Sequence, residues 1–143
     1  MSDELEDYPI CVTRAISWGQ MDAFQHVNNA HYFRFFEDAR IAYFEAIGIY
    51  DVDEHQPNDH IGPILAETSC RFKAPLTYPD DVVIGARAAD IQQDRFTLEY
   101  AVWSASLDRI AATGDSLVVS YDYAEGHKVD LPDDWRSAIE DLG

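Results

Sequence analysis

One stretch of the chain constrains the fold more than any other, because its apolar residues return at three- and four-residue steps. Between residues 32 and 47 this spacing places the apolar side chains on one face of a helix. Helices of this kind are buried along that face. The face consists of Tyr32, Phe35, Phe36, Ala39, Tyr43, Ala46 and Ile47.

The residues at both ends of this stretch fit the boundaries of a helix. Asn28 and Asn29 are good N-cap residues, because their side chains accept hydrogen bonds from the first free amides. Gly48 supplies a stop at the other end. Arg34 and Asp38 are spaced as an ion pair on the exposed face. We therefore predict one long helix with a polar outer surface.

Strand-like runs lie on both sides of the predicted helix. Apolar residues alternate from Ile10 to Trp18, which predicts a first strand. Residues 50 to 61 have no period and read as a long loop. A short helix begins near Pro132 and runs toward Leu142. Between the loop and this terminal helix, the predicted strands cover residues 64–72, 82–91, 96–104 and 110–123.

This order of elements predicts an α+β fold, in which a five-stranded antiparallel sheet wraps around the long helix. With 143 residues, the chain fits one domain over residues 1–143, with residues 1–7 as a flexible acidic tail. Such a sheet leaves its edges open, and pairing across an edge to form a homodimer is the simplest remedy.

The charge balance excludes several kinds of partner. The formal net charge is −17 with only 10 Lys and Arg residues, whereas nucleic acids and anionic membranes require a basic face. No stretch resembles a signal peptide or a membrane span, so we expect a cytoplasmic protein. The acidity fits either a salt-rich cytoplasm or an ordinary one. Cys11 and Cys70 match no metal or redox spacing, and we expect reduced core cysteines.

The segment from Trp18 to Tyr32 reads WGQMDAFQHVNNAHY, and residues 36–40 read FEDAR. These motifs resemble the 4-hydroxybenzoyl-CoA thioesterase family of hot-dog hydrolases. Members of that family place an Asp, a turn and His-Val-Asn-Asn before an aromatic helix. The similarity continues through residues 62–67 and 72–81 to the Leu131-Pro132 tail. Gln20 departs from the pattern, because many relatives have an acidic residue there.

The resemblance implies a hot-dog fold and the hydrolysis of an acyl-CoA thioester. It implies no metal or redox cofactor, with coenzyme A only as part of the substrate. It further implies a homodimer or a homotetramer of two dimers, with the pocket between subunits. By the same resemblance, Asp22 is the catalytic carboxylate and the backbone amide of Asn29 is the oxyanion donor.

Elementary chemistry supports those two roles. Thioester hydrolysis needs a nucleophile or base beside the carbonyl carbon and a positive dipole beside its oxygen. The free amides that open a helix supply such a dipole. Asp22 acts either as a nucleophile or as a general base, unless it only forms the turn. His26 either orients Asp22, lines the pocket or forms a turn hydrogen bond.

Further residues are candidates for binding the substrate. Asn28 and Tyr32 are two of these candidates, unless Asn28 bonds only its own backbone. Ile61, Ile64 and Leu65 are the apolar candidates that would border the acyl group. The phosphates of coenzyme A would need local cations, and the candidates are Arg71, Lys73 and Arg95, unless they only balance neighbouring acids such as Asp94. A group formed by Asp53, His55, Asp59 and His60 matches no standard metal site.

Three other functions remain open at this stage. The acyl donor is either coenzyme A or an acyl-carrier protein, although the acidic surface weighs against an acidic carrier. Dehydratases of similar architecture carry a His-Phe-Pro type of motif, which this sequence lacks. A non-catalytic acyl-CoA-binding protein is the third alternative. The sequence does not select the acyl group.

Overall fold

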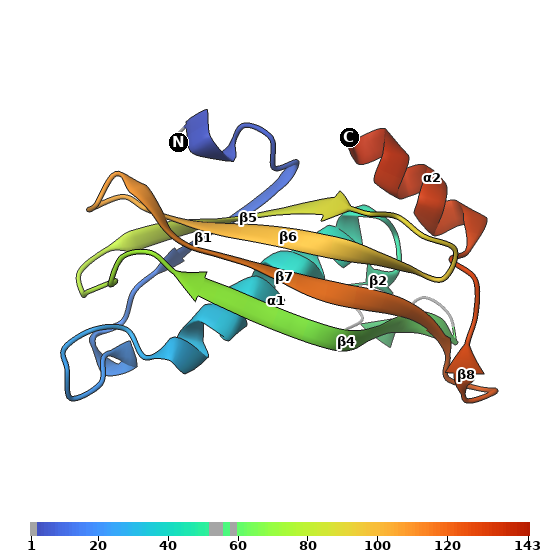
Figure 1. Cartoon of the computed structure of the whole chain (residues 1–143), viewed down its shortest axis with the longest axis horizontal. Helices are drawn as coiled ribbons and strands as arrows, with labels where there is room; N and C mark the ends of the chain where they lie inside the picture. The colour runs from blue at the N-terminus through green and yellow to red at the C-terminus, as the bar shows by residue number, and fades with distance from the viewer. Residues whose placement is uncertain (1–2, 52–55, 58–59) are drawn as a thin grey trace.

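A curled antiparallel sheet lies against one long helix, α1 (Figure 1). The computed structural model describes residues 3–51, 56–57 and 60–143. Its helical elements are η1 (Asp3–Leu5), η2 (Trp18–Gln20), α1 (Asn29–Ala46) and α2 (Asp133–Leu142). Its strands are β1 (Ile10–Ala15), β2 (Tyr50–Asp51), β3 (Gln56–Pro57), β4 (Ile61–Phe72), β5 (Asp81–Ala89), β6 (Arg95–Ser104), β7 (Arg109–Asp122) and β8 (His127–Lys128).

The main sheet has the order β1-β5-β6-β7-β4, and all its neighbouring strands are antiparallel. The two-residue strand β8 adds to β7, and β2 pairs with β3 apart from this sheet. This topology confirms the predicted α+β hot-dog fold. No helix in the described ranges is long and apolar enough to cross a membrane.

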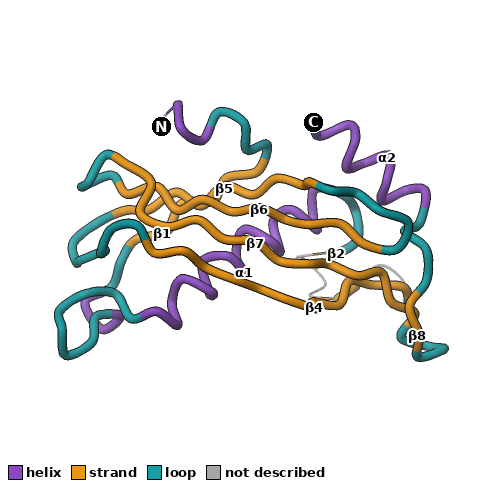
Figure 2. The backbone as a smooth tube through the Cα atoms, viewed as in Figure 1, coloured by secondary structure: helices purple, strands orange, loops and turns teal. Residues whose placement is uncertain are grey.

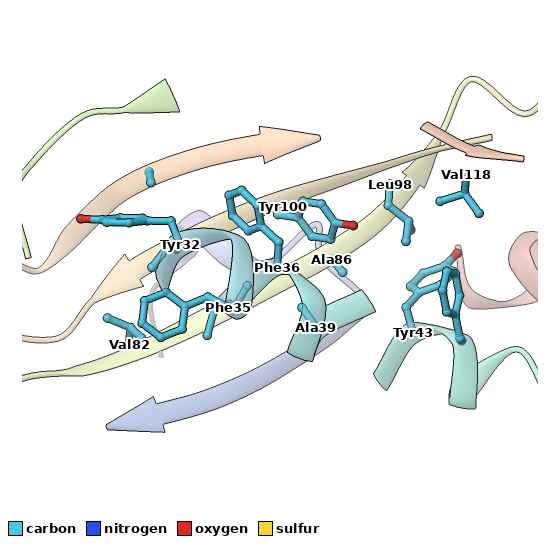
Figure 3. Packing of buried hydrophobic residues seen from close by; sticks show 14 of the residues in the cluster. Tyr32, Phe35, Phe36, Ala39, Tyr43, Val82, Ala86, Leu98, Tyr100 and Val118 are labelled. Carbon is cyan, nitrogen blue, oxygen red and sulfur yellow. The ribbon is translucent and has the colours of Figure 1, made fainter. Parts of the chain in front are cut away.

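The buried face of α1 packs against the centre of the sheet. The ring of Phe36 stacks on Tyr100 of β6, with centroids 4.6 Å apart and planes 9° from parallel (Figure 3). Phe36 also lies over Gly114 of β7, where a Cβ atom would overlap its ring. Every residue of the predicted helical stripe is buried except Ala46, and Phe44 is buried in addition. The predicted core face is therefore correct apart from Ala46.

Both ends of α1 follow from local sequence. The side chain of Asn28 accepts a hydrogen bond from the amide of Ala30, which confirms it as the N-cap. Beyond the C-terminal end, Gly48 has a φ of +82°. Its amide donates to Glu45 O, and the amide of Ile49 donates to Phe44 O. This pair of bonds forms a Schellman motif, which needs a left-handed residue where Gly48 stands.

Four local predictions are wrong. Arg34 pairs with Glu37 rather than with Asp38, which instead pairs with Arg14 of β1. Tertiary contact with β1 thus overrides the helical spacing. The first strand ends at Ala15, because η2 begins at Trp18.

The third correction concerns the N-terminal segment. We expected residues 1–7 to form a free tail, but in its described part residues 3–5 form η1, which contacts β6. Leu5 is only 3% exposed, so an apolar side chain anchors this acidic segment to the sheet. The predicted loop after α1 likewise contains the short strands β2 and β3.

Candidate active site

The loop from Met21 to Asn28 links η2 to the start of α1 and carries Asp22. Met21 and Val27 form an isolated antiparallel bridge that closes the loop. Inside it, the Asp22 amide donates to His26 O at 3.0 Å, and the Gln25 amide donates to Asp22 O at 2.9 Å. These bonds fix the backbone of Asp22 in a tight turn.

This loop lies at the same end of the sheet as the connection between β4 and β5 (Figure 2). The amide of Val27 donates to Leu76 O at 2.8 Å. The amide of Tyr78 also reaches the sulfur of Met21 at 3.5 Å. Two segments about fifty residues apart in sequence therefore build one surface around Asp22.

The Asp22 carboxylate is exposed, and each of its oxygens accepts a hydrogen bond. Oδ1 accepts from the amide of Phe24 at 2.9 Å, and Oδ2 accepts from the side-chain amide of Asn28 at 3.3 Å. Asn28 also caps α1, since its Oδ1 accepts from the amide of Ala30 at 3.0 Å. One side chain thus joins the carboxylate to the start of the helix.

The first amides of α1 differ in their partners. The amide of Ala30 bonds to the Asn28 side chain, and the amide of His31 donates to Asn28 O at 3.0 Å. Among the described residues, no group accepts a hydrogen bond from the amide of Asn29. An unpaired N–H at the positive end of a helix suits a developing negative charge.

Two neighbouring pockets open beside the loop. The Asp22 pocket has a volume of about 360 Å³, and its lining residues are Trp18, Met21, Asp22, Gln25, Thr77 and Tyr78. The Asn29 pocket has a volume of about 290 Å³, and it is lined by His26, Val27, Asn29, Tyr32, Phe72, Lys73, Ala74 and Pro75. In the single chain, Asp22 and Asn29 therefore face adjoining pockets rather than one.

The other predicted residues near the loop lie in the Asn29 pocket. His26 lines this pocket, and among the described residues its bond to Asp22 is through the backbone alone. Tyr32 is 2% exposed and meets Phe72 edge-on, with ring centroids 4.9 Å apart. Burial raises the pKa of Tyr32, so its hydroxyl stays protonated at neutral pH. Lys73 supplies a cation to the same pocket.

The remaining predicted binding residues lie elsewhere. Ile61, Ile64 and Leu65 occupy the opposite end of β4 from Phe72. Arg71 is exposed on β4 and lines neither pocket. The guanidinium of Arg95 binds both carboxylate oxygens of Asp94, at 2.7 and 3.2 Å, so it balances a neighbouring acid as the alternative anticipated.

The structure describes only one of the four Asp and His residues that matched no standard metal site. Asp53, His55 and Asp59 lie outside the described residues. His60 approaches Asp122, with Nε2 3.7 Å from Oδ2. The backbone amides of Glu125 and Ala124 lower the pKa of Asp122, so this carboxyl is ionised at neutral pH. Within the ranges that the structure describes, no three candidate ligands come together.

Neither cysteine lines the two pockets, although the Cys70 thiol lies near Tyr32 and contributes to the raised pKa of that residue. Both cysteines are free and partly buried. Burial raises the pKa of Cys11 and brings that of Cys70 to about 11. Thiols with raised pKa values hold little thiolate at neutral pH and are poor nucleophiles.

Sequence reasoning missed several residues of the site. Trp18, Met21, Thr77 and Tyr78 line the Asp22 pocket only because the β4–β5 connection folds against the loop. Trp18 is 71% exposed and Phe24 is 82% exposed, so two large aromatic rings flank Asp22 at the surface. The hydrogen bond from Asn28 to Asp22 was also missed, because the spacing of six residues matches no regular element.

Comparison with known proteins places this geometry in context. The model of the thioesterase-like superfamily matches residues 16–139. A thioesterase of Thermus thermophilus, solved with coenzyme A and Zn, is 26% identical, with a TM-score of 0.82 over 96% of each chain. A 1,4-dihydroxy-2-naphthoyl-CoA thioesterase of Synechocystis is 19% identical, with a TM-score of 0.79 over 93% of this chain and 96% of its own.

A third similar structure is the PA5185 protein of Pseudomonas aeruginosa strain PAO1. It is 24% identical, with a TM-score of 0.81 over 96% of this chain and 94% of its own. The two structures below 25% identity support the fold alone. The family match covers the loop, the long helix and the whole main sheet except β1. This chain therefore belongs to the thioesterase-like superfamily.

Proposed function

We propose that this protein hydrolyses an acyl-CoA thioester to a free acid and coenzyme A. One observation carries the proposal: Asn28 links the Asp22 carboxylate to the start of α1, where the Asn29 amide has no acceptor among the described residues. Membership of the thioesterase-like superfamily supports the reaction class. The coenzyme A bound to the similar thioesterase from Thermus thermophilus supports the acyl carrier.

The proposed reaction uses two groups of the chain. Asp22 either attacks the thioester carbon or removes a proton from the water that attacks it. The Asn29 amide donates to the carbonyl oxygen as negative charge develops there. If Asp22 attacks, the carbon–sulfur bond breaks to leave an acyl anhydride on Asp22, and one water molecule supplies both the proton that leaves on the sulfur and the hydroxide that hydrolyses the anhydride to the free acid. If Asp22 acts as a base, the proton that it removes from the attacking water passes to the sulfur as the carbon–sulfur bond breaks. Asp22 alone can therefore serve as the base or the nucleophile.

The exposed apolar residues of edge strand β4 favour an assembly of at least two copies. Strand β4 ends the main sheet, and Ile64, Leu65 and Phe72 along it are each at least 39% exposed. We propose that two β4 edges pair antiparallel, as a dimer or as part of a tetramer of two dimers. Paired along their full length, such strands bring the Ile61 end of one to the Phe72 end of the other. Sedimentation equilibrium should show a dimer or tetramer and no monomer at micromolar concentration.

In this assembly, residues that are far apart in one chain meet across the interface. The apolar residues Ile61, Ile64 and Leu65 of one copy would border the Asn29 pocket of the other and contact the acyl group. Lys73, already in that pocket, would bind a phosphate of coenzyme A. Arg71 lies two residues away on the same strand end and is a second candidate for the phosphates.

The first experiment is a thiol-release assay over a panel of short-chain, long-chain and aromatic acyl-CoA substrates. Asp22→Asn keeps the size of the side chain but removes the base, so turnover should fall on the order of 10²- to 10⁴-fold. Asp108→Asn is the matched control, because Asp108 lies on the exposed turn between β6 and β7. It should retain full activity. A native protein that binds these compounds but cleaves none would contradict the proposal and indicate a non-catalytic binding protein.

A further inference from the structure

We infer that Asn28 is a positioning residue, which holds the Asp22 carboxylate at the start of α1 while capping the same helix. The inference rests on the proposed function, because it concerns the reaction in which Asp22 would act. It differs from the binding role predicted for Asn28 from the sequence. Asn28 would act through Asp22 and would not need to touch the substrate.

The chemistry of the amide group carries the first step. The Oδ1 atom of Asn28 is committed to the cap, where it accepts from the amide of Ala30 at 3.0 Å. An amide offers one acceptor side and one donor side, so the cap leaves the NH₂ group to point the other way. That group meets Oδ2 of Asp22 at 3.3 Å. Capping therefore determines which face of Asn28 is presented to the carboxylate.

The second step is that this contact restrains a carboxylate that little else restrains. The Asp22 side chain is exposed, and its other oxygen accepts only from the amide of Phe24, at 2.9 Å, among the described residues. Without Asn28, the carboxylate would keep only the hydrogen bond from the Phe24 amide, and one hydrogen bond does not fix its rotation. A hydrogen bond to a carboxylate is stronger than one between two neutral groups. Loss of the bond from Asn28 should therefore leave the Asp22 carboxylate less well fixed.

No other common capping residue can make both bonds. Aspartate accepts at the cap, but when ionised it has no hydrogen to donate. Serine also caps helices well, but its side chain is one bond too short to span the distance from Ala30 to Asp22. These two substitutions therefore remove the link to Asp22 while keeping the helix start intact.

The test measures kcat, KM and the pH profile of Asn28→Ser and Asn28→Asp against the native protein. We expect kcat to fall roughly 10- to 100-fold in both variants, because the reacting group is less well placed. KM should change little. In Asn28→Asp, the acid limb of the kcat/KM profile should also move to higher pH, because two adjacent carboxylates resist ionising together.

Gln20→Glu is the matched control for added charge. Gln20 lies near the start of the same loop, and its Oε1 accepts from the amide of Ser17 at 2.7 Å, a bond that Glu can keep. Among the described residues its side chain has no bond to Asp22. The acid limb should therefore stay in place in this variant. Native kcat and an unmoved pH profile in both Asn28 variants would overturn the positioning role.

A second measurement does not depend on activity. The side-chain NH₂ resonances of Asn28 should shift with pH in the native protein and stay constant in Asp22→Asn. Resonances that ignore pH in the native protein would overturn the contact itself. A native protein that releases no thiol from any acyl-CoA would instead overturn the proposed function, and the catalytic part of this inference with it.

Discussion

Gln25 adopts a backbone conformation that is costly for its type of side chain. Its φ is +61°, in the left-handed region where Asp90 and Asp108 also lie, at +49° and +53°. Short polar side chains tolerate this region because they can bond to nearby backbone, but Gln gains no such help. The turn that Gln25 completes is the one that carries Asp22. Local strain at the candidate site is thus held in place by the surrounding bonds.

At this position, Gln25→Gly should stabilise the protein. Glycine removes the penalty of about 1 to 2 kcal/mol for the left-handed conformation. Part of this gain is offset, because glycine also increases the conformational entropy of the unfolded chain. We expect the free energy of unfolding to rise by about 0.5 kcal/mol, measured by urea denaturation. Asp108→Gly is the control and should gain less. A loss of stability in Gln25→Gly would contradict this account of the turn.

At the scale of elements, the approach of α1 to the sheet depends on Gly114. This residue lies opposite Cys70 of β4 and Tyr100 of β6, directly under the helix. A Cβ atom there would overlap the Phe36 ring and the carbonyl oxygen of Ser69. Glycine is required here for space. At Gly48, by contrast, a Cβ atom would meet nothing within 4 Å, and glycine is required only for its positive φ.

The two glycines should therefore respond differently to alanine. Gly114→Ala should destabilise the protein by about 1 to 3 kcal/mol or more, because overpacking must move α1 or β7. Gly48→Ala should cost about 1 kcal/mol from backbone conformation alone. Thermal unfolding measures both losses. Near-ultraviolet circular dichroism should change only in Gly114→Ala, whose aromatic stack is displaced, and an unchanged spectrum there would refute the packing argument.

At the scale of the whole molecule, the excess of carboxylates places acidic side chains next to one another. The chain carries a formal net charge of −17. On the sheet, Glu99 of β6 lies directly opposite Asp115 of β7. Arg87 relieves Glu99 through a contact of 2.9 Å, while Asp115 accepts only from the hydroxyl of Ser69 at 2.9 Å among the described residues. Like charges placed directly across strands destabilise a sheet.

Stability should consequently rise with salt. As KCl increases to about 1 M, the Debye length shortens to about 3 Å and the repulsion between carboxylates is screened. The urea midpoint should increase from low to high KCl. Asp115→Asn keeps the acceptor for Ser69 and should raise stability at low salt by about 0.2 to 1 kcal/mol, with a smaller gain at high salt. A midpoint independent of KCl would contradict this account and would favour the ordinary cytoplasm over the salt-rich one.

The sequence by itself determined the elements whose causes are local. Periodicity predicted the buried face of α1, and the residues next to its ends predicted the Asn28 cap and the Gly48 stop. Each of these depends on neighbours within about four positions, which a single sequence displays directly. The motif around Asp22 was predictable by resemblance for the same reason, since its residues are consecutive.

Only the tertiary structure decided which of these residues meet. Asp38 pairs with Arg14 of β1 and not with Arg34 of its own helix. Asn28 bonds to Asp22 because the loop between them folds back on itself. Met21 and Tyr78 share a pocket although 57 positions separate them. The loop that carries Asp22 reaches the β4–β5 connection only in the folded chain, where the Val27 amide donates to Leu76 O. Local pattern therefore predicts what each segment becomes, whereas packing determines which chemical groups it brings together.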